Sequence, residues 1–170
     1  MSVIPGVNLK SSIGLEEPVS RLVRKKRDFP AWHFGMLNDA ARNDAIESSI
    51  AALNLRGKTV FEIGTGAGLI ALLFAKYGAE HVFTCEMNPN LAAVAQRIVA
   101  ATPYANRITV INESSTVAIS QGSLPRHSDV IFTETLDCGV VGEGFMPIAD
   151  DIADLAGPNT IIMPRNVRQY

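Results

Sequence analysis

The chain has 170 residues, which suits one domain with a well-buried core. A formal net charge of −2 and a pI near 5.9 give it no general attraction to nucleic acid or anionic lipid. The longest apolar run, residues 69–75, is too short to span a bilayer, and the N-terminus lacks a secretion signal. The two cysteines are 53 positions apart without metal-ligand spacing, so we expect reduced thiols, a cytoplasmic protein and no membrane association.

The N-terminal residues carry no clear periodicity. We expect residues 1–29 to form a flexible or helical leader, followed by a single domain over residues 30–170. Five of the seven residues from Arg21 to Arg27 are basic. Such a run can contact nucleic acid, but a solvated helix face explains it more simply. It therefore gives no clear indication of nucleic-acid binding.

From residue 38 onward, predicted helices alternate with apolar strands. The predicted helices cover residues 38–53, 69–76, 89–101 and 148–155, and the predicted strands cover residues 59–63, 81–85, 108–111, 130–132 and 160–163. Strands that are apolar almost throughout indicate a mostly parallel sheet covered by helices on both faces, so the predicted class is α/β and Rossmann-like. Ligands of such sheets bind outside the carboxyl ends of the strands.

A glycine-rich loop follows the first predicted strand. The strand runs into Gly64-Thr65-Gly66-Ala67-Gly68, and the second strand is followed by Glu86, 22 positions after Gly64. Glycines let the backbone approach a ligand closely, and an acid at the tip of the second strand can bind both hydroxyls of a ribose. A dinucleotide fingerprint would need glycine where Leu69 stands. The loop instead reads E-x-G-x-G-x-G from Glu62, the form typical of methyltransferases that use S-adenosylmethionine (SAM), so SAM is favoured over NAD.

Two glutamates follow the fourth predicted strand. Glu134 and Glu143 are nine positions apart, and three glycines lie between Cys138 and Phe145. A hairpin here would bring both carboxylates into one pocket beside the cofactor. Two facing carboxylates suit a guanidinium, which is planar, permanently charged and able to donate along two edges. These residues alone leave a second interpretation open, namely a solvated loop whose acids only keep it soluble.

Three separated motifs together resemble the protein arginine N-methyltransferases. They are the segment W-H-F-G-M-L-N-D-A-A-R-N at residues 32–43, the glycine loop, and T-E-x-x-D-x-x-x-x-G-E-G at residues 133–144. The resemblance covers roughly residues 30–170 and implies a class I SAM-dependent methyltransferase fold. It implies methyl transfer from SAM to a guanidino nitrogen of arginine, with S-adenosyl-L-homocysteine as product and no metal. The implied partner is a protein substrate with an accessible arginine.

The resemblance assigns cofactor-binding roles residue by residue. They fall on His33, Met36, Arg42, Glu62, Gly64, Gly66, Gly68, Glu86, Met87 and Ser115. Arg42 matches the arginine that pairs with the SAM carboxylate, Met36 a methionine near the methyl donor, and Ser115 the position that meets adenine. From the residues alone, Arg42 could instead pair with Asp39 or Glu47 near it in sequence.

The same resemblance makes Glu134 and Glu143 the catalytic pair that clamps the substrate arginine. The family's Tyr-Phe-x-x-Tyr segment is replaced by basic residues 24–27. Its β-barrel, with a Thr-His-Trp loop and a dimerisation arm, would follow the last predicted strand and is not found before Tyr170. We therefore expect either the cofactor-binding part of a longer protein or a compact relative with a more open site, and a homodimer is one option. An arginine methyltransferase is favoured; a SAM-dependent enzyme with another acceptor and a SAM-binding module without turnover stay open.

Overall fold

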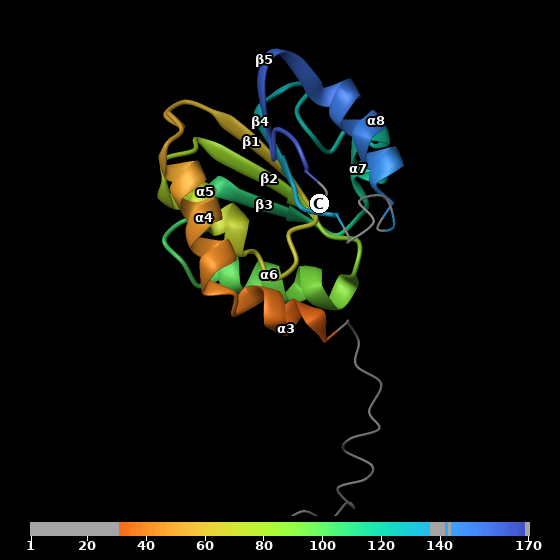
Figure 1. The fold of residues 1–170 in the computed structure, drawn as a ribbon. Coiled ribbons are helices and arrows are strands. Elements are labelled where there is room, and N and C mark those ends of the chain that lie inside the picture. The colour runs from red at the N-terminus through yellow and green to blue at the C-terminus, as the bar shows by residue number, and fades with distance from the viewer. Residues whose placement is uncertain (1–30, 137–141, 143, 169–170) are drawn as a thin grey trace, which may run out of the picture.

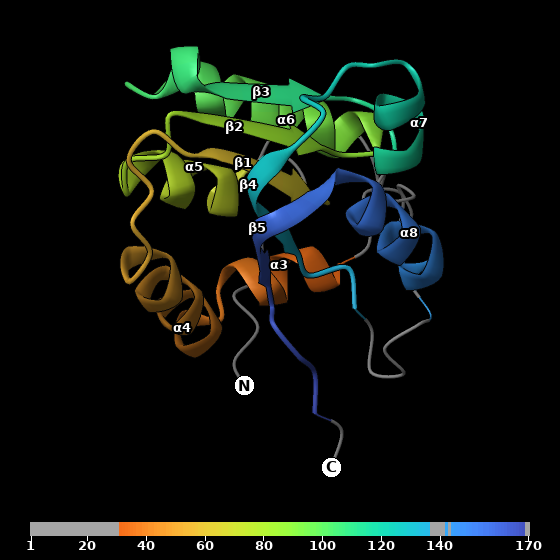
Figure 2. The ribbon, with the colours of Figure 1, turned by 90° about the horizontal axis from the view of Figure 1, so that it is seen from above.

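The computed structural model describes residues 31–136, 142 and 144–168. The expected leader and Glu143 lie outside these residues. One five-stranded sheet forms the centre, with strand order β3-β2-β1-β4-β5 and every pair parallel (Figure 2). The strands are β1 (Thr59–Ile63), β2 (His81–Cys85), β3 (Ile108–Ile111), β4 (Ser128–Thr133) and β5 (Ala156–Met163). The predicted α/β class with a parallel sheet is confirmed.

Helices cover both faces of this sheet. They are α3 (Trp32–Leu37), α4 (Ala40–Ala51), α5 (Leu69–Lys76), α6 (Pro89–Ala100), α7 (Ser115–Ser120) and α8 (Phe145–Leu155), with a 3-10 turn η1 (Ala105–Arg107). Helices α4, α5 and α6 pack on one face, whereas α7 and α8 pack on the other (Figure 1). Alternate residues of one strand serve the two cores, since Val60 faces the first and Phe61 the second. Burial on both faces explains the apolar runs of the central strands β1 and β4, whereas the edge strand β5 has no buried residue.

Two short helices were not predicted. The helix predicted over residues 38–53 corresponds to α4 alone, and the Asp39 side chain sets its start by accepting the backbone N–H of Arg42 at 3.0 Å. Helix α3 lies before it, in residues for which no element was predicted. Helix α7 was missed altogether and read as part of a loop. The helix begins with serine and threonine, and the Ser114 side chain caps it by accepting the backbone N–H of Val117 at 3.3 Å.

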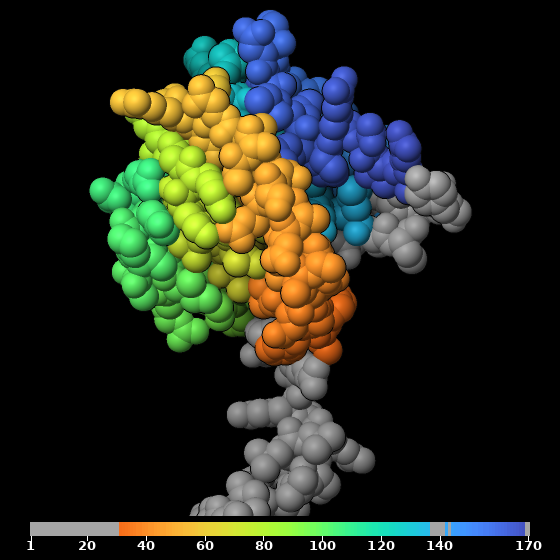
Figure 3. All heavy atoms as spheres, turned by 60° about the vertical axis from the view of Figure 1, so that its left-hand side comes forward, coloured from red at the N-terminus to blue at the C-terminus, as the bar shows by residue number. Residues whose placement is uncertain are grey.

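The N-terminal helices α3 and α4 lie at the surface of the described fold. No residue of α3 is buried, and only Ile50 is buried in α4. Both helices form a band on the surface in the space-filling view (Figure 3). Ion pairs link α4 to the rest of the domain, from Arg42 to Glu134 and from Glu47 to Lys76. Across the described residues, no helix combines the length and the apolar character needed to cross a membrane.

Candidate active site

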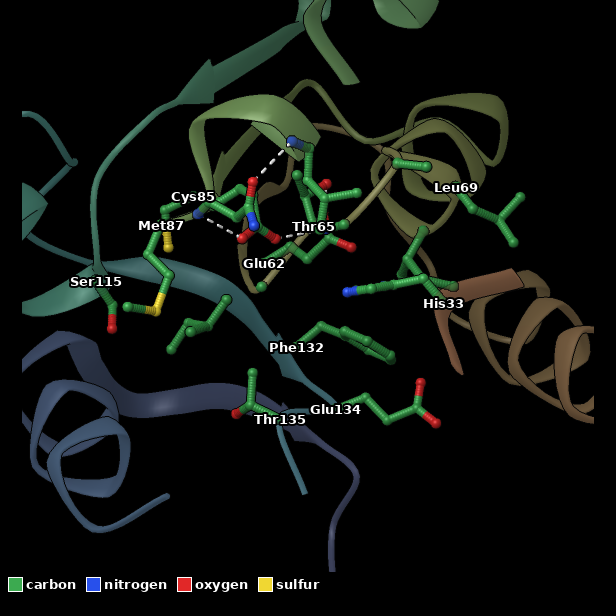
Figure 4. Close-up of a pocket in the computed structure, with 18 of the residues that line it drawn as sticks. His33, Glu62, Thr65, Leu69, Cys85, Met87, Ser115, Phe132, Glu134 and Thr135 are labelled. Atoms are coloured by element: carbon green, nitrogen blue, oxygen red, sulfur yellow. Dashed lines mark hydrogen bonds between the residues drawn. The ribbon is translucent and has the colours of Figure 1, made fainter. Parts of the chain in front are cut away.

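A cavity of about 780 Å³ opens at the carboxyl ends of β1, β2 and β4. This volume falls within the range of ordinary small-molecule sites. Met87 and Ser115 lie at one end of the cavity, and His33 and Glu134 lie at the other (Figure 4). The position agrees with the rule that ligands bind at the carboxyl edge of a parallel sheet.

The structure brings nearly all of the predicted residues that it describes to this cavity. Those that line it are His33, Met36, Arg42, Glu62, Gly64, Gly66, Glu86, Met87, Ser115 and Glu134. Gly68 is not among the lining residues. A Cβ at Gly68 would make only ordinary contact with Ala95 Cβ, at 3.5 Å, so glycine is favoured there by its φ of +91°. The second glutamate of the predicted pair, Glu143, lies outside the described residues.

The glycine loop is held against the end of β2. The backbone N–H groups of Gly64 and Thr65 both donate to the carbonyl oxygen of Cys85, each at 3.0 Å. Gly64 has φ of +82°, and a Cβ there would come within 2.8 Å of Thr135 Cγ2. The loop therefore touches the segment that follows β4, and glycine is needed both for the backbone angle and for the space.

Glu86 is an almost fully buried carboxylate, only 8% exposed. One oxygen accepts the backbone N–H of Gly66 at 3.0 Å, and the other accepts the backbone N–H of Asn88 at 2.8 Å. Each oxygen keeps lone pairs for a ligand, so this fixed carboxylate can accept two ribose hydroxyls. Asn88 was not predicted, although the Asn-Pro pair at the start of α6 signals a helix cap, which its side chain provides.

Glu62 is buried deeper, at 1% exposure, and also lines the cavity. The hydroxyls of Thr65 and Thr84 donate to its Oε2 at 2.8 and 2.6 Å. Burial raises the pKa of Glu62 to about 7, and the two hydroxyl donors oppose this rise. A cationic group entering the cavity would favour the ionised form. Thr84 reads in the sequence as an ordinary strand residue, so nothing there marked this contact.

Cys85, the residue before Glu86, has a free thiol and lines the cavity. Burial raises its pKa to about 12. The thiol therefore stays protonated at neutral pH and is a poor nucleophile. The burial of Cys85, at 2% exposure, is that of a core residue; Cys138 lies outside the described residues.

Arg42 and Glu134 form a bidentate ion pair at the end of the cavity where His33 lies. Nε of Arg42 donates to one carboxylate oxygen at 2.8 Å, and Nη2 donates to the other oxygen. Nη1 donates to the side chain of Asn43 at 2.7 Å, which fixes the fork further. Asp39 contacts only the backbone of Arg42, and Glu47 pairs with α5. The guanidinium of Arg42 is thus paired with the carboxylate of Glu134, which the resemblance assigned to binding the substrate arginine.

Aromatic side chains from α3 complete this end. The rings of Trp32 and His33 are stacked with centroids 3.9 Å apart and an interplanar angle of 23°. Trp32 is exposed and lines the cavity together with Met36. The end of the cavity at Arg42 and Glu134 is therefore open to solvent on the side of α3. Its second predicted wall, the hairpin that would carry Glu143, lies largely outside the described residues.

Comparison with known proteins identifies the relatives of this chain. No family model matches it. An arginine N(omega)-methyltransferase of Streptomyces achromogenes subsp. streptozoticus is 40% identical over 146 residues, covering 85% of this chain and 40% of the enzyme. The solved structure of Arabidopsis thaliana protein arginine methyltransferase 10 has a TM-score of 0.70 at 26% identity, covering 81% of this chain and 39% of that one. A crystal structure of PRMT6-SAH has a TM-score of 0.55 at 27% identity, covering 61% and 34%.

The chain thus spans about 40% of the length of the Streptomyces relative. The likeness extends over most of the described domain and includes its central sheet. Sequence and fold agree that the chain belongs to the protein arginine N-methyltransferase family.

Proposed function

We propose that this chain binds SAM and transfers its methyl group to a guanidino nitrogen of arginine in a protein, with S-adenosyl-L-homocysteine and a proton as the other products. The observation that carries the proposal is the two-pronged contact between Glu134 and Arg42 in the cavity. Because both oxygens of Glu134 accept from one guanidinium, this contact supports a role for Glu134 in holding the guanidinium of a substrate. Membership of the arginine methyltransferase family supports the same reaction.

The residues at the other end suit the cofactor. Glu86 offers two fixed oxygens to ribose hydroxyls, Glu62 offers a carboxylate to an ammonium group, and the glycine loop allows a close approach. The PRMT6-SAH relative supports this choice of ligand. When bound, SAM supplies a methyl group on a positively charged sulfur, and the chain itself provides positioning and charge.

Arg42 and Glu134 then have linked roles. The positive charge of Arg42 and the negative charge of Glu134 balance each other while the two side chains are paired. A cofactor carboxylate that attracts Arg42 would release both oxygens of Glu134 for the substrate guanidinium. Glu134 would then orient the guanidinium and concentrate electron density on the nitrogen that faces the methyl group. We assign Glu143 as the second carboxylate of this clamp on the strength of its spacing from Glu134.

Partner and location follow from the same reading. We infer that the partner is a protein substrate with an accessible arginine. A free, buried thiol at Cys85 supports a reducing, cytoplasmic setting. A homodimer is one assembly to test, by measuring the mass of the chain in solution.

The direct test is transfer of labelled methyl from SAM to a protein lysate, followed by amino-acid analysis. We expect label in methylarginine with the wild type and its loss in Glu143→Gln, while calorimetry still detects SAM binding to both. Glu80→Gln, at an exposed position, is the matched control. Label in another amino acid would assign a different acceptor. Bound SAM without any label would leave a binding module or a part that needs the rest of a longer protein.

A further inference from the structure

A buried aspartate lies behind the end of the cavity that holds Ser115. Asp151, in α8, is only 5% exposed and is not among the lining residues. Its Oδ2 accepts the hydroxyl of Ser115 at 2.6 Å and the hydroxyl of Thr116 at 2.9 Å. Ser115 and Thr116 form the start of α7, and both line the cavity. Asp151 therefore contacts two cavity residues from the side away from a ligand.

The contacts with Asp151 determine whether the hydroxyls of Ser115 and Thr116 donate to a ligand or accept from it. A hydroxyl has one hydrogen to donate and two lone pairs that accept, whereas a carboxylate can only accept. The 2.6 Å distance from Ser115 to Asp151 is the short separation expected when a hydroxyl donates to an ionised oxygen. Both hydrogens are thus committed to Asp151. Ser115 and Thr116 can offer only lone pairs to a ligand in the cavity.

The base of a bound nucleoside would lie at this end. Glu86 marks the ribose position at the end of β2, and Met87 follows it directly. Met87 and Ser115 lie at the end of the cavity away from Glu134 (Figure 4). A ligand with its ribose on Glu86 and its sulfur towards Glu134 has its base directed towards Met87 and Ser115.

We propose that Asp151 determines which purine the site accepts, an inference that rests on the proposed cofactor site. By holding the hydroxyls of Ser115 and Thr116 as acceptors, it selects a 6-aminopurine, whose exocyclic amine donates. A 6-oxopurine presents an oxygen at the same position and would leave acceptor facing acceptor. A polar site that cannot pair with an analogue rejects it strongly. Asp151 is a positioning residue here, because it acts through the two hydroxyls.

The test compares two ligands that differ in the group at C6 of the base and in the hydrogen that the 6-oxo form carries on the neighbouring N1. Calorimetry on the full chain measures the affinity for S-adenosyl-L-homocysteine and for its deaminated analogue, S-inosyl-L-homocysteine. We expect the wild type to bind the 6-amino form about 10- to 100-fold more tightly. In Asp151→Ala the hydroxyls can rotate and donate, so the ratio should fall to about threefold or less. Asp151→Asn keeps an acceptor oxygen and should retain most of the preference.

The ratio separates this role from a merely structural one, because a loosened cavity weakens both ligands alike. Asp150→Ala, at an exposed position of the same helix, should keep the wild-type ratio. Ser115→Ala provides a second route if Asp151→Ala does not fold, and it should also lower the ratio. The inference would be overturned if the ratio of the two affinities stayed unchanged in Asp151→Ala or in Ser115→Ala, or if the wild type bound both ligands equally. A wild type that binds neither ligand would instead overturn the proposed function.

Discussion

The two ends of the cavity are built from different material. At the cofactor end, Glu62 and Glu86 are 1% and 8% exposed and are held by backbone amides and neighbouring hydroxyls. At the acceptor end, the side chains of Arg42 and Glu134 are 19% and 36% exposed, and they hold each other across 92 positions of sequence. Under the proposed assignment, the nucleoside part of the cofactor would bind to the buried carboxylates, whereas the surface groups would bind the acceptor, through Glu134, and the cofactor carboxylate, through Arg42. The two functions should be separable by mutation.

The largest separation is expected for Glu134→Gln. The change removes the charge that would attract and orient the substrate guanidinium and leaves only one acceptor oxygen. Methyl transfer should fall about 10²- to 10⁴-fold. The affinity for SAM should change far less, since the buried carboxylates are untouched. Rates with labelled SAM and calorimetry on the same preparation check both quantities. A loss of SAM affinity as large as the loss of rate would contradict the separation.

A pH titration tests the buried end. Burial raises the pKa of Glu62 to about 7 from a reference of 4.5, so the folded state holds this proton more tightly than the unfolded state. The stability gained is fully present below about pH 4.5 and is lost as the pH rises through about 7. The shift corresponds to on the order of 3 kcal/mol.

Denaturant unfolding of the ligand-free chain at several pH values measures this effect. Relative to Glu62→Gln, which cannot ionise, the wild type should lose free energy of unfolding over that pH window. Parallel pH profiles for the two proteins would show that Glu62 titrates normally. Glu113→Gln, which alters a glutamate at the exposed edge of the same cavity, controls for a general change of charge.

Gly64, in the glycine loop, packs against Thr135, which follows Glu134 in the sequence. An alanine there would have φ of +82° and a Cβ 2.8 Å from Thr135 Cγ2, so Gly64→Ala should cost about 2 kcal/mol of unfolding free energy. Thr135→Ser removes the clashing methyl group. The double variant should recover the steric part of this cost and leave the part due to the backbone angle. Equal costs for Gly64→Ala with either residue at 135 would show that Thr135 does not limit the loop.

Local patterns in the sequence predicted the buried end better than the exposed end. The glycine loop and Glu86 follow directly from strands whose burial is visible as apolar runs, and the structure places both at the cavity. Helix α7 was missed because a run of serine and threonine is more typical of a loop. The signal that would have predicted the helix is Ser114, which caps it. Asp151 was missed because an aspartate in an acidic helix reads as a surface residue. Its partners come from another helix, and such contacts leave no local signal.

The ion pair across the acceptor end was also beyond sequence reasoning, and Arg42→Lys tests what it does. The resemblance gave Arg42 to the cofactor and Glu134 to the substrate, whereas the structure joins them. Lysine keeps the charge but lacks the planar fork, so the affinity for SAM should fall about tenfold. Arg97→Lys, on the exposed side of α6, should change nothing. At saturating SAM, the rate should stay well above that of Glu134→Gln, because Glu134 is then free to bind the substrate. An equally low rate would mean that Arg42 is needed to position Glu134 itself, and the two ends would then be one unit.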